Sequence, residues 1–272
     1  AGNDNTVSNT FAWTYDSVGP TMTITATGLN TGGSSNAATV ALTFTSNEAT
    51  TGFDANDITL SGGTIGALSG SGTTYTATFT PSGVQGSKTI DVAVNLFTDS
   101  SGNQNSAAPQ FTYTYDTVAP TMTITSTTVS SGDTSNDGNV AYVFTSNSPT
   151  ADFVETDITE TGGTWSAFTG VTTVKYTATF TPDGQGPTSV SVAADAFTDA
   201  AGNDNTVSNT FTWTYDSVGP TMTITSGVGV SGQTTNDATI ALTFTSSEST
   251  SNLVEGDITV TNGAISNFAG SG

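Results

Sequence analysis

The sequence repeats with a period of 100 residues, and this period constrains the fold more than any other feature. Residues 1–16 are identical to residues 201–216 except that Ala12 stands where the later copy has Thr212. A period of this length fits one small domain per repeat rather than a one- or two-element solenoid unit. We therefore divide the chain into the last strand of a preceding repeat, two complete repeats and the first half of a third: 1–16, 17–116, 117–216 and 217–272.

Within each repeat, apolar residues alternate with threonine. The segment FTYTY at 111–115 is one example of this period of two. Such alternation is typical of strands buried on one face, and β-branched threonine suits the exposed face. No segment long enough to form a helix has apolar residues at helical spacing. The sequence predicts an all-β fold with seven strands in repeat one, near 20–26, 39–45, 57–61, 64–68, 73–80, 88–95 and 109–115.

Seven short strands in about 100 residues are the pattern of an immunoglobulin-like β-sandwich. We therefore predict tandem immunoglobulin-like sandwiches in an extended rod. In the sixth strand, the inward-facing set would be Ile90, Val92 and Val94. The large core residues would be aromatic, with tryptophan replacing the last of them in repeat two: Phe44, Phe79, Phe97, Phe111, Tyr113 and Trp213.

The charge of the chain is one-sided. Against 23 acidic residues there are two basic ones, Lys88 and Lys175, and the formal net charge is −21. Binding to a phosphate backbone needs clustered lysine and arginine, so this charge excludes nucleic acid as a main partner. It also argues against contact of this segment with an anionic membrane, and no apolar run approaches the length of a membrane span.

The chain contains no cysteine, histidine or arginine, which restricts its chemistry. Nucleophilic triads, zinc sites and phosphate clamps depend on these residue types. A pair of carboxylates could still serve a glycosidase, but no pair is distinguished from ordinary loop acids. We therefore expect a protein that is not an enzyme and has no catalytic residues.

Four segments of repeat one together resemble a known family. They are FTSNEATTGFDANDITLSGG at 44–63, TTYTATFTP at 73–81, FTDSSGNQN at 97–105 and YDTVAPTMTIT at 115–125. Their combination closely resembles the bacterial immunoglobulin-like repeats of very large surface adhesins and other extracellular fibres. The resemblance implies a stalk or fibre at the bacterial cell surface, often stiffened by calcium between domains.

Topology gathers acidic loops at one end of each sandwich. When strands run alternately up and down, the second-to-third and sixth-to-seventh loops lie where the first strand enters. The hinge aspartate arrives at the same end from the preceding repeat. These segments carry the predicted calcium ligands: Asp16, Glu48, Asp57, Asp99 and Asn103 in repeat one, Asp116, Asp157, Asp199 and Asn203 in repeat two, and Asp216, Glu248 and Asp257 in repeat three.

Calcium binds six to eight oxygen atoms from carboxylates, amides, backbone carbonyls and water. We therefore predict a calcium ion at each junction between repeats. The alternative is that these acids solvate the loops and cap turns through side-chain hydrogen bonds. One departure weakens the second junction, because Ser148 stands where the other repeats have Glu48 and Glu248. That junction would bind more weakly, keep an extra water, or recruit Asp152 or Glu155.

Two functions fit these observations. The first is a semi-rigid stalk or filament, because each hinge is short and ends in proline, which fixes its own φ and favours an extended residue before it. Its partners would be the neighbouring repeats and, in a filament or matrix, other copies. The second is a module that binds a glycan or partner protein through exposed loops or threonine-rich strand faces. The incomplete end units predict a window of a longer array in preference to strand exchange between subunits.

Overall fold

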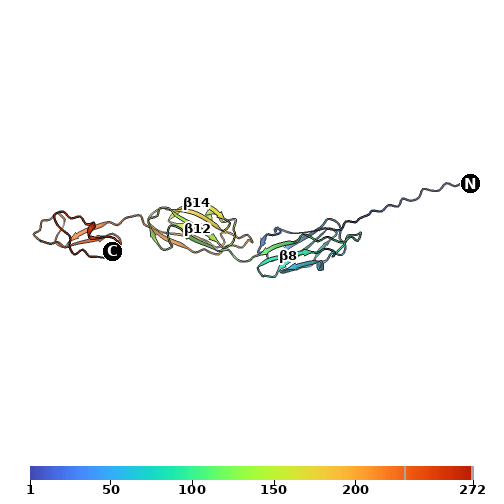
Figure 1. The fold of residues 1–272 in the computed structure, drawn as a ribbon, viewed down its shortest axis with the longest axis horizontal. Coiled ribbons are helices and arrows are strands. Elements are labelled where there is room, and N and C mark those ends of the chain that lie inside the picture. Colours follow the sequence, from blue (N-terminus) through green and yellow to red (C-terminus); the bar gives the residue numbers. More distant parts are fainter. Residues whose placement is uncertain (230, 271–272) are drawn as a thin grey trace.

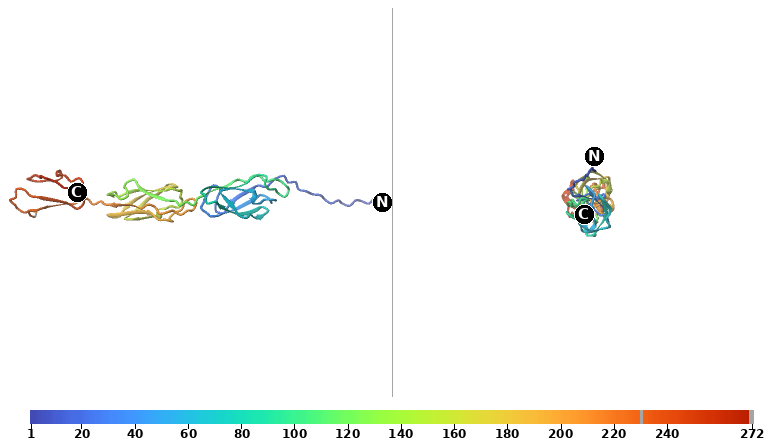
Figure 2. Two further views of the ribbon diagram at one scale, coloured as in Figure 1. Left: turned by 90° about the horizontal axis from the view of Figure 1, so that it is seen from below. Right: turned by 90° about the vertical axis from the view of Figure 1, so that its right-hand side faces the viewer.

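The computed structural model describes residues 1–229 and 231–270. Two complete β-sandwiches and a partial third unit follow one another along one axis (Figure 1). Views from two further directions show the same elongated outline (Figure 2). The all-β prediction is confirmed, since the helical elements among the described residues are three single 3-10 turns: η1 Ala55–Asp57, η2 Glu155–Asp157 and η3 Glu255–Asp257. The described residues contain no helix that is long and apolar enough to cross a membrane.

Repeat one folds into two sheets. The first has the order β1-β3-β7-β5, with β6 also paired to β7, and the second has the order β2-β9-β8-β4. This is the order of an immunoglobulin-like sandwich, with one short added strand at the edge of the second sheet. The bounds are β1 Met22–Ala26, β2 Ser34–Ser35, β3 Val40–Ser46, β4 Ile58–Ser61, β5 Gly63–Ile65, β6 Ser69–Ser71, β7 Thr74–Pro81, β8 Gly86–Val92 and β9 Phe111–Tyr115.

Repeat two has the same topology, with sheets ordered β10-β12-β15-β14 and β11-β17-β16-β13. A single strand, β14, takes the place of β5 and β6, and its pairing with β15 shifts register twice. The bounds are β10 Met122–Ser126, β11 Thr134–Ser135, β12 Val140–Ser146, β13 Ile158–Thr161, β14 Gly163–Thr172, β15 Lys175–Pro182, β16 Gly186–Val192 and β17 Phe211–Tyr215.

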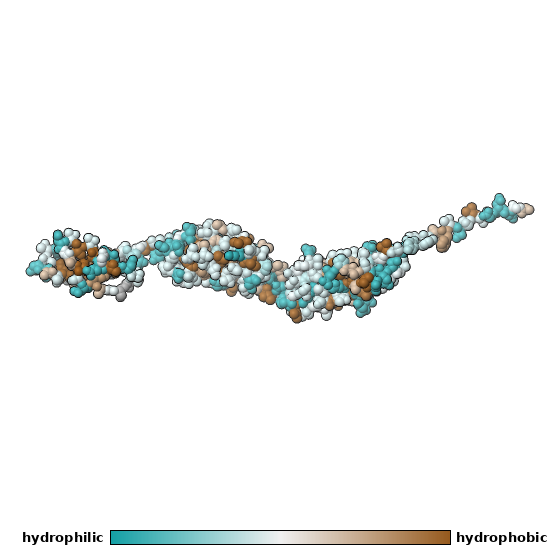
Figure 3. Space-filling view, in the orientation of Figure 1, coloured by the Kyte–Doolittle hydropathy of each residue, from teal (hydrophilic) through white to brown (hydrophobic). Residues whose placement is uncertain are grey.

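Strand alternation determines which side chains enter the core. In β7 the residues Tyr75, Ala77 and Phe79 are buried and the threonines between them are exposed. The aromatic residues predicted for the two cores are all buried: Phe44, Phe79, Phe97, Phe111, Tyr113 and Trp213. The visible surface is accordingly pale or hydrophilic over much of both complete repeats, with smaller apolar patches (Figure 3).

Three details of the sequence prediction are wrong. Val94 is 52% exposed, because β8 ends at Val92 and the chain turns away from the sheet. Of the strand predicted at 64–68, only Thr64 and Ile65 form strand, at the end of β5, and a second short strand, β6, pairs with another part of β7 beyond the predicted range. The edge strand β2, which pairs in parallel with β9, was not predicted, because two polar residues carry no alternation signal.

The two ends of the chain differ from the complete repeats. In the third unit, β18 Met222–Ser226 pairs with β19 Leu242–Ser246, but the predicted third and fourth strands are not formed among the described residues. Their counterparts in repeat two pair with β16 and β15. Residues 1–15 extend away from repeat one and pair with no described strand, so the predicted terminal strand is absent as well. A strand needs a hydrogen-bonded neighbour, and the N-terminal segment and the end of the third unit each lack one among the described residues.

Two buried tyrosines differ in their hydrogen bonding. Burial raises the pKa of Tyr113 and of Tyr142 to about 12, so both phenols stay protonated. Tyr142 accepts a hydrogen bond of 3.1 Å from Trp213 Nε1. The Tyr113 hydroxyl has no partner among the described residues. The two repeats therefore differ in whether the buried tyrosine hydroxyl has a hydrogen-bond partner.

We expect Tyr142→Phe to destabilise repeat two by about 1–3 kcal/mol, because it leaves the buried Trp213 Nε1–H unpaired. The matched change Tyr113→Phe should be neutral or stabilise repeat one by up to about 1 kcal/mol, because it removes an unpaired buried hydroxyl. Urea unfolding measures both effects, with tryptophan fluorescence following repeat two and far-ultraviolet circular dichroism following both repeats. Equal losses in the two variants would contradict this assignment.

Candidate metal centre

Three acidic side chains meet at the end of repeat one where the chain enters. Asp16 lies in the hinge before β1, Glu48 in the loop after β3, and Asp99 in the loop after β8. One carboxylate oxygen of each lies within 4.8 Å of the other two. The two loops are held side by side by Thr51 and Thr98, whose backbones exchange hydrogen bonds of 2.6 and 3.1 Å. The topology thus brings carboxylates from three separate segments to one place.

Asp99 is fixed within its loop. Its Oδ1 accepts hydrogen bonds from the amides of Ser101 and Asn103, at 2.8 and 2.9 Å, and its Oδ2 accepts from Asn103 Nδ2 at 2.8 Å. Burial raises the pKa of the Asp99 carboxyl, but the hydrogen bonds from Asn103 and the loop amides outweigh burial and lower the pKa overall. Asp99 is therefore a preorganised carboxylate, ionised at neutral pH.

Asp16 connects the hinge to the same loop. Its Oδ1 accepts a hydrogen bond of 3.1 Å from the Val18 amide, and its Oδ2 accepts one of 3.3 Å from Ser101 Oγ. Asn103 Nδ2 also donates to the Asp16 backbone carbonyl at 3.2 Å. Asp16 therefore shapes the hinge and presents an oxygen to the cluster at the same time.

The charge of Glu48 is only partly compensated, because burial and two neighbouring carboxylates raise its pKa by more than the Asn47 side chain lowers it. Its Oε1 is buried and has no hydrogen-bond partner among the described residues. Loss of water around the carboxyl, followed by the negative charges of Asp16 and Asp99, raises the pKa of Glu48 above its ordinary value. Repulsion between like charges at this distance opposes folding unless the charges are screened or neutralised.

The structure places other predicted ligands elsewhere. Asp57, Asp157 and Asp257 each accept a hydrogen bond from the backbone amide at the start of the adjacent 3-10 turn, at 2.8, 2.8 and 2.9 Å. They cap these turns, as the alternative interpretation expected, and none belongs to the carboxylate cluster. Asn103 and Asn203 lie beside Asp99 and Asp199 but direct their amide nitrogen, not their oxygen, at those carboxylates.

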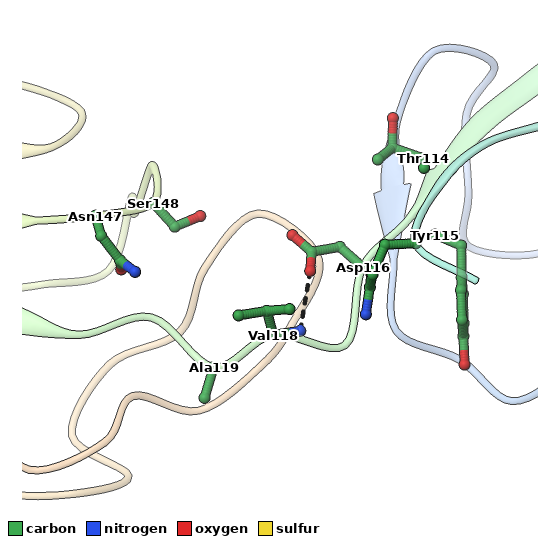
Figure 4. A pocket seen from close by; sticks show the side chains of 9 residues that line it. Thr114, Tyr115, Asp116, Val118, Ala119, Asn147 and Ser148 are labelled. Carbon is green, nitrogen blue, oxygen red and sulfur yellow. Dashed lines mark hydrogen bonds between the residues drawn. The ribbon is translucent and has the colours of Figure 1, made fainter. Parts of the chain in front are cut away.

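The second junction has a weaker set of oxygen ligands. Asp116 and Ser148 lie on opposite sides of a groove of about 300 Å³ between repeats one and two (Figure 4). The Asp116 side chain accepts a hydrogen bond of 2.9 Å from the Val118 amide. Asp199 lies in the loop after β16, as Asp99 does after β8, but no group of three neighbouring carboxylates is present here among the described residues.

Neither acid proposed as a substitute reaches this groove. Asp152 Oδ2 accepts hydrogen bonds from the amide and hydroxyl of Thr198, at 3.0 and 2.7 Å, and its Oδ1 accepts from the Thr150 hydroxyl at 2.7 Å. Burial raises the pKa of Asp152, but these hydrogen bonds outweigh burial and lower it overall. Glu155 is exposed in the first turn of η2. At the second junction, therefore, neither acid replaces the glutamate that is absent at position 148.

The third junction is present only in part. Asp216 accepts a hydrogen bond of 3.1 Å from the Val218 amide, as the other hinge aspartates do. Glu248 belongs to no group of three neighbouring carboxylates among the described residues. The 272 residues end before the counterparts of Asp99 and Asn103 in this unit.

The hinge of the second junction is hydrogen-bonded to both repeats. On the repeat-one side, the Asp116 amide donates to the Ser35 carbonyl at 3.1 Å. Gln85 donates to the Thr117 hydroxyl at 2.6 Å and accepts from the Thr117 amide at 3.1 Å. On the repeat-two side, the Thr121 amide donates to Asn147 Oδ1 at 2.7 Å. The residues between these contacts are 118–120, which end in proline.

The role of the hinge glutamine was not predicted from the sequence. Gln185 makes the same two hydrogen bonds to Ser217, at 2.6 and 3.0 Å, in the following hinge. The constant spacing of 32 residues between glutamine and hinge was a signal in the sequence. Glutamine is uncharged and these two positions match no known motif, so their role could not be distinguished from that of other loop residues.

In cation-free buffer, we expect Glu48→Gln to raise the unfolding temperature of repeat one. A carboxyl whose folded pKa is raised makes folding less favourable above that pKa, and this penalty disappears as the pH falls towards the pKa of the unfolded chain. The advantage of the variant should therefore be largest at neutral pH and vanish below about pH 4.

Scanning calorimetry of the 272-residue chain in EDTA measures this difference. Glu248→Gln is the matched control, because Glu248 has no such carboxylate group around it among the described residues. If the Glu48→Gln chain is less stable than the wild type in EDTA at neutral pH, the prediction is wrong. The Glu48 charge would then stabilise the folded repeat and not oppose it.

Comparison with known proteins identifies the repeat. Residues 16–115 and 116–215 each match the family described as the bacterial Ig-like domain, one residue earlier than the units defined above. No curated protein matches the chain. Among solved structures, it is similar to InvD of Yersinia pseudotuberculosis, with 15% identity and a TM-score of 0.38 over 77% of this chain and 63% of that one.

Two further structures give similar values. The Escherichia coli adhesin FdeC has 16% identity and a TM-score of 0.38, with 87% of this chain and 75% of that chain covered. Invasin, described as a bacterial integrin-binding protein, has 17% identity and a TM-score of 0.39, with 75% and 41% covered. The family of this chain is identified by the two matched repeats. Because those repeats make up most of its length, the chain belongs to the bacterial Ig-like domain family.

Proposed function

We propose that this chain is part of a non-enzymatic stalk or fibre of an extracellular bacterial adhesin. The observation that carries this proposal is the hinge between repeats one and two, where side chains and backbone of both sandwiches hold the connecting residues. A hinge with few free residues restricts the angle between neighbouring domains. A chain of such repeats would serve to hold another part of the protein at a distance from the cell.

The reach of such a stalk follows from its geometry. A strand of seven residues spans roughly 24 Å, and each domain with its loops adds somewhat more than that. Stiff joints make the length grow in proportion to the number of repeats, whereas flexible joints make it grow only with the square root. An array of these repeats therefore extends furthest for its size when every joint is restrained.

The first junction would be restrained by a calcium ion. Asp16, Glu48 and Asp99 each offer one carboxylate oxygen to this cluster, and a buried oxygen of Glu48 lacks any other partner among the described residues. This donor set fits calcium, which prefers oxygen ligands and accepts water or backbone carbonyls for the remainder. The ion would neutralise the repulsion among the three carboxylates and connect the hinge to two loops of repeat one.

The threonine-rich faces support the alternative function less well. In repeat one, pairing of β1, β3 and β7 aligns threonines in two rows across the sheet, and repeat two keeps this pairing but interrupts the rows. The rows are Thr23, Thr45, Thr74 and Thr25, Thr43, Thr76, whereas repeat two has Lys175 and Val143 within them. A face that binds a regular lattice would need to continue from one repeat to the next, so this interruption favours the stalk.

The stalk proposal is tested by electron microscopy of the 272-residue chain together with glycan binding. We expect uniform straight particles and no retention on glycan arrays. Bent particles of many shapes would contradict the stalk. Glycan retention that Thr45→Ala abolishes, but that the equivalent change Thr145→Ala does not, would instead support the binding module.

Calcium binding is tested by isothermal titration calorimetry after removal of metal with EDTA. The wild type should bind one ion with an affinity that Glu48→Gln weakens by at least about tenfold, a loss of about 1.4 kcal/mol. Ser148→Glu should create a second site by placing a third carboxylate beside Asp116 and Asp199, and Ser148→Gln is its uncharged control. A wild type that neither binds calcium nor gains stability from it would contradict the proposal.

A further inference from the structure

The end of repeat one that faces repeat two carries an asparagine directly after β2. The Asn36 amide donates to the Ala201 carbonyl at 3.0 Å. The Asn36 side-chain nitrogen donates to the Gly202 carbonyl at 2.8 Å and to Asn203 Oδ1 at 3.1 Å. One residue of repeat one thus makes three hydrogen bonds to the loop that follows β16 in repeat two.

Asn203 extends this contact into its own loop and back to the hinge. Its Nδ2 donates to the Asp116 carbonyl at 3.0 Å and to Asp199 Oδ2 at 3.1 Å. The Asp199 Oδ1 in turn accepts from the amides of Ala201 and Asn203, at 2.9 and 3.0 Å. The hydrogen bonds form a continuous network from repeat one, through the hinge, to the loop of repeat two.

Burial within the chain shows the effect of this contact. Ala201 and Asn203 are 7% and 9% exposed. Their counterparts in repeat one, Ser101 and Asn103, lie in a loop of the same shape that faces no preceding sandwich, and both are more exposed. The two loops share their internal hydrogen bonds. The difference in burial therefore comes from the neighbouring repeat.

We infer that Asn36 holds repeats one and two in a fixed orientation through direct hydrogen bonds to the Ala201–Asn203 loop, without a metal ion. The surface at the end of β2 fits a loop with free backbone carbonyls and an asparagine, which the following repeat supplies. This inference goes beyond the proposed function, because it assigns the two junctions different physical bases. The first would depend on three carboxylates and a cation, whereas the hydrogen bonds that Asn36 makes across the second join neutral groups.

Neutral hydrogen bonds explain why the second junction tolerates serine at 148. The Asn203 side chain binds Asn36 through its oxygen and Asp116 and Asp199 through its nitrogen, so the amide is committed to the contact between the repeats. The joint thus has its own restraint where the third carboxylate is missing. Removing divalent cations should loosen the first junction while the orientation of repeats one and two is kept.

The test is solution NMR of the 272-residue chain in EDTA. Residual dipolar couplings should give repeats one and two one common alignment tensor. The Asn36 amide should exchange with solvent at least about tenfold more slowly than the Asn136 amide. Asn136 is its counterpart in repeat two and makes no hydrogen bond to another described residue.

Asn36→Ala should give the two repeats alignment tensors that differ by about twofold in magnitude, since an independently moving domain averages its couplings. Asn36→Asp should do the same, because it places a carboxylate against the Gly202 carbonyl and Asn203 Oδ1. Asn136→Ala is the matched control and should leave the common tensor unchanged. Exchange of core amides such as Ile90 and Val190 shows whether each sandwich remains folded.

Two results would overturn the inference. One is an Asn36→Ala chain with folded cores that keeps a common tensor. The other is a wild type whose repeats move independently in EDTA but become aligned when calcium is added, which would assign the second junction to the cation. The calcium proposal for the first junction would survive either result, because it is measured by ion binding at Asp16, Glu48 and Asp99.

Discussion

The extended form of this protein depends on hydrogen bonds that hold the hinge to both of the sandwiches it connects. Strand β9 ends at Tyr115, and the next two residues are bonded to Ser35 and Gln85 of the same repeat. Thr121 is already bonded to repeat two. Only residues 118–120 lie between these contacts, so the hinge has little freedom to bend. Because the chain enters and leaves each sandwich at opposite ends, a hinge of this kind places successive domains in a line.

The excess of acidic residues serves several separate purposes. Asp57 and its counterparts cap 3-10 turns, the hinge aspartates bond to the amide two residues ahead, and Asp99 and Asp199 organise their loops. Most of these carboxylates are therefore satisfied by backbone amides. The cluster of Asp16, Glu48 and Asp99 differs because one Glu48 oxygen is buried without a partner among the described residues. This difference, and not the net charge, is the basis of the calcium proposal.

Much of the fold could be predicted from the sequence because its signals are local and repeated. Alternation in segments such as Thr74–Pro81 identified the strands and the buried aromatic residues. The end of the sandwich that gathers Asp16, Glu48 and Asp99 followed from strand order alone. The family resemblance agreed with the match to the bacterial Ig-like domain.

The missed features depend on contacts between distant segments. Asn36 bonds to residues 166 and 167 positions later, and its side chain is indistinguishable in the sequence from other loop asparagines. Asp57 was taken for a ligand because it lies in the right loop, but the loop contains a 3-10 turn whose first amide it caps. Acidic residues in the same loop can therefore point to different places, depending on the turns within that loop. Strand alternation and composition do not predict these turns.

The rigid joint between repeats one and two is the central claim, and a distance distribution between spin labels tests it most directly. The chain has no cysteine, so Ser69→Cys and Thr169→Cys place one label on each sandwich at exposed positions. Double electron–electron resonance should give one narrow distribution that is the same in EDTA and in calcium. A broad distribution in both conditions would contradict the account, because it would show that the hydrogen bonds of Asn36, Gln85 and Asn147 do not fix the hinge.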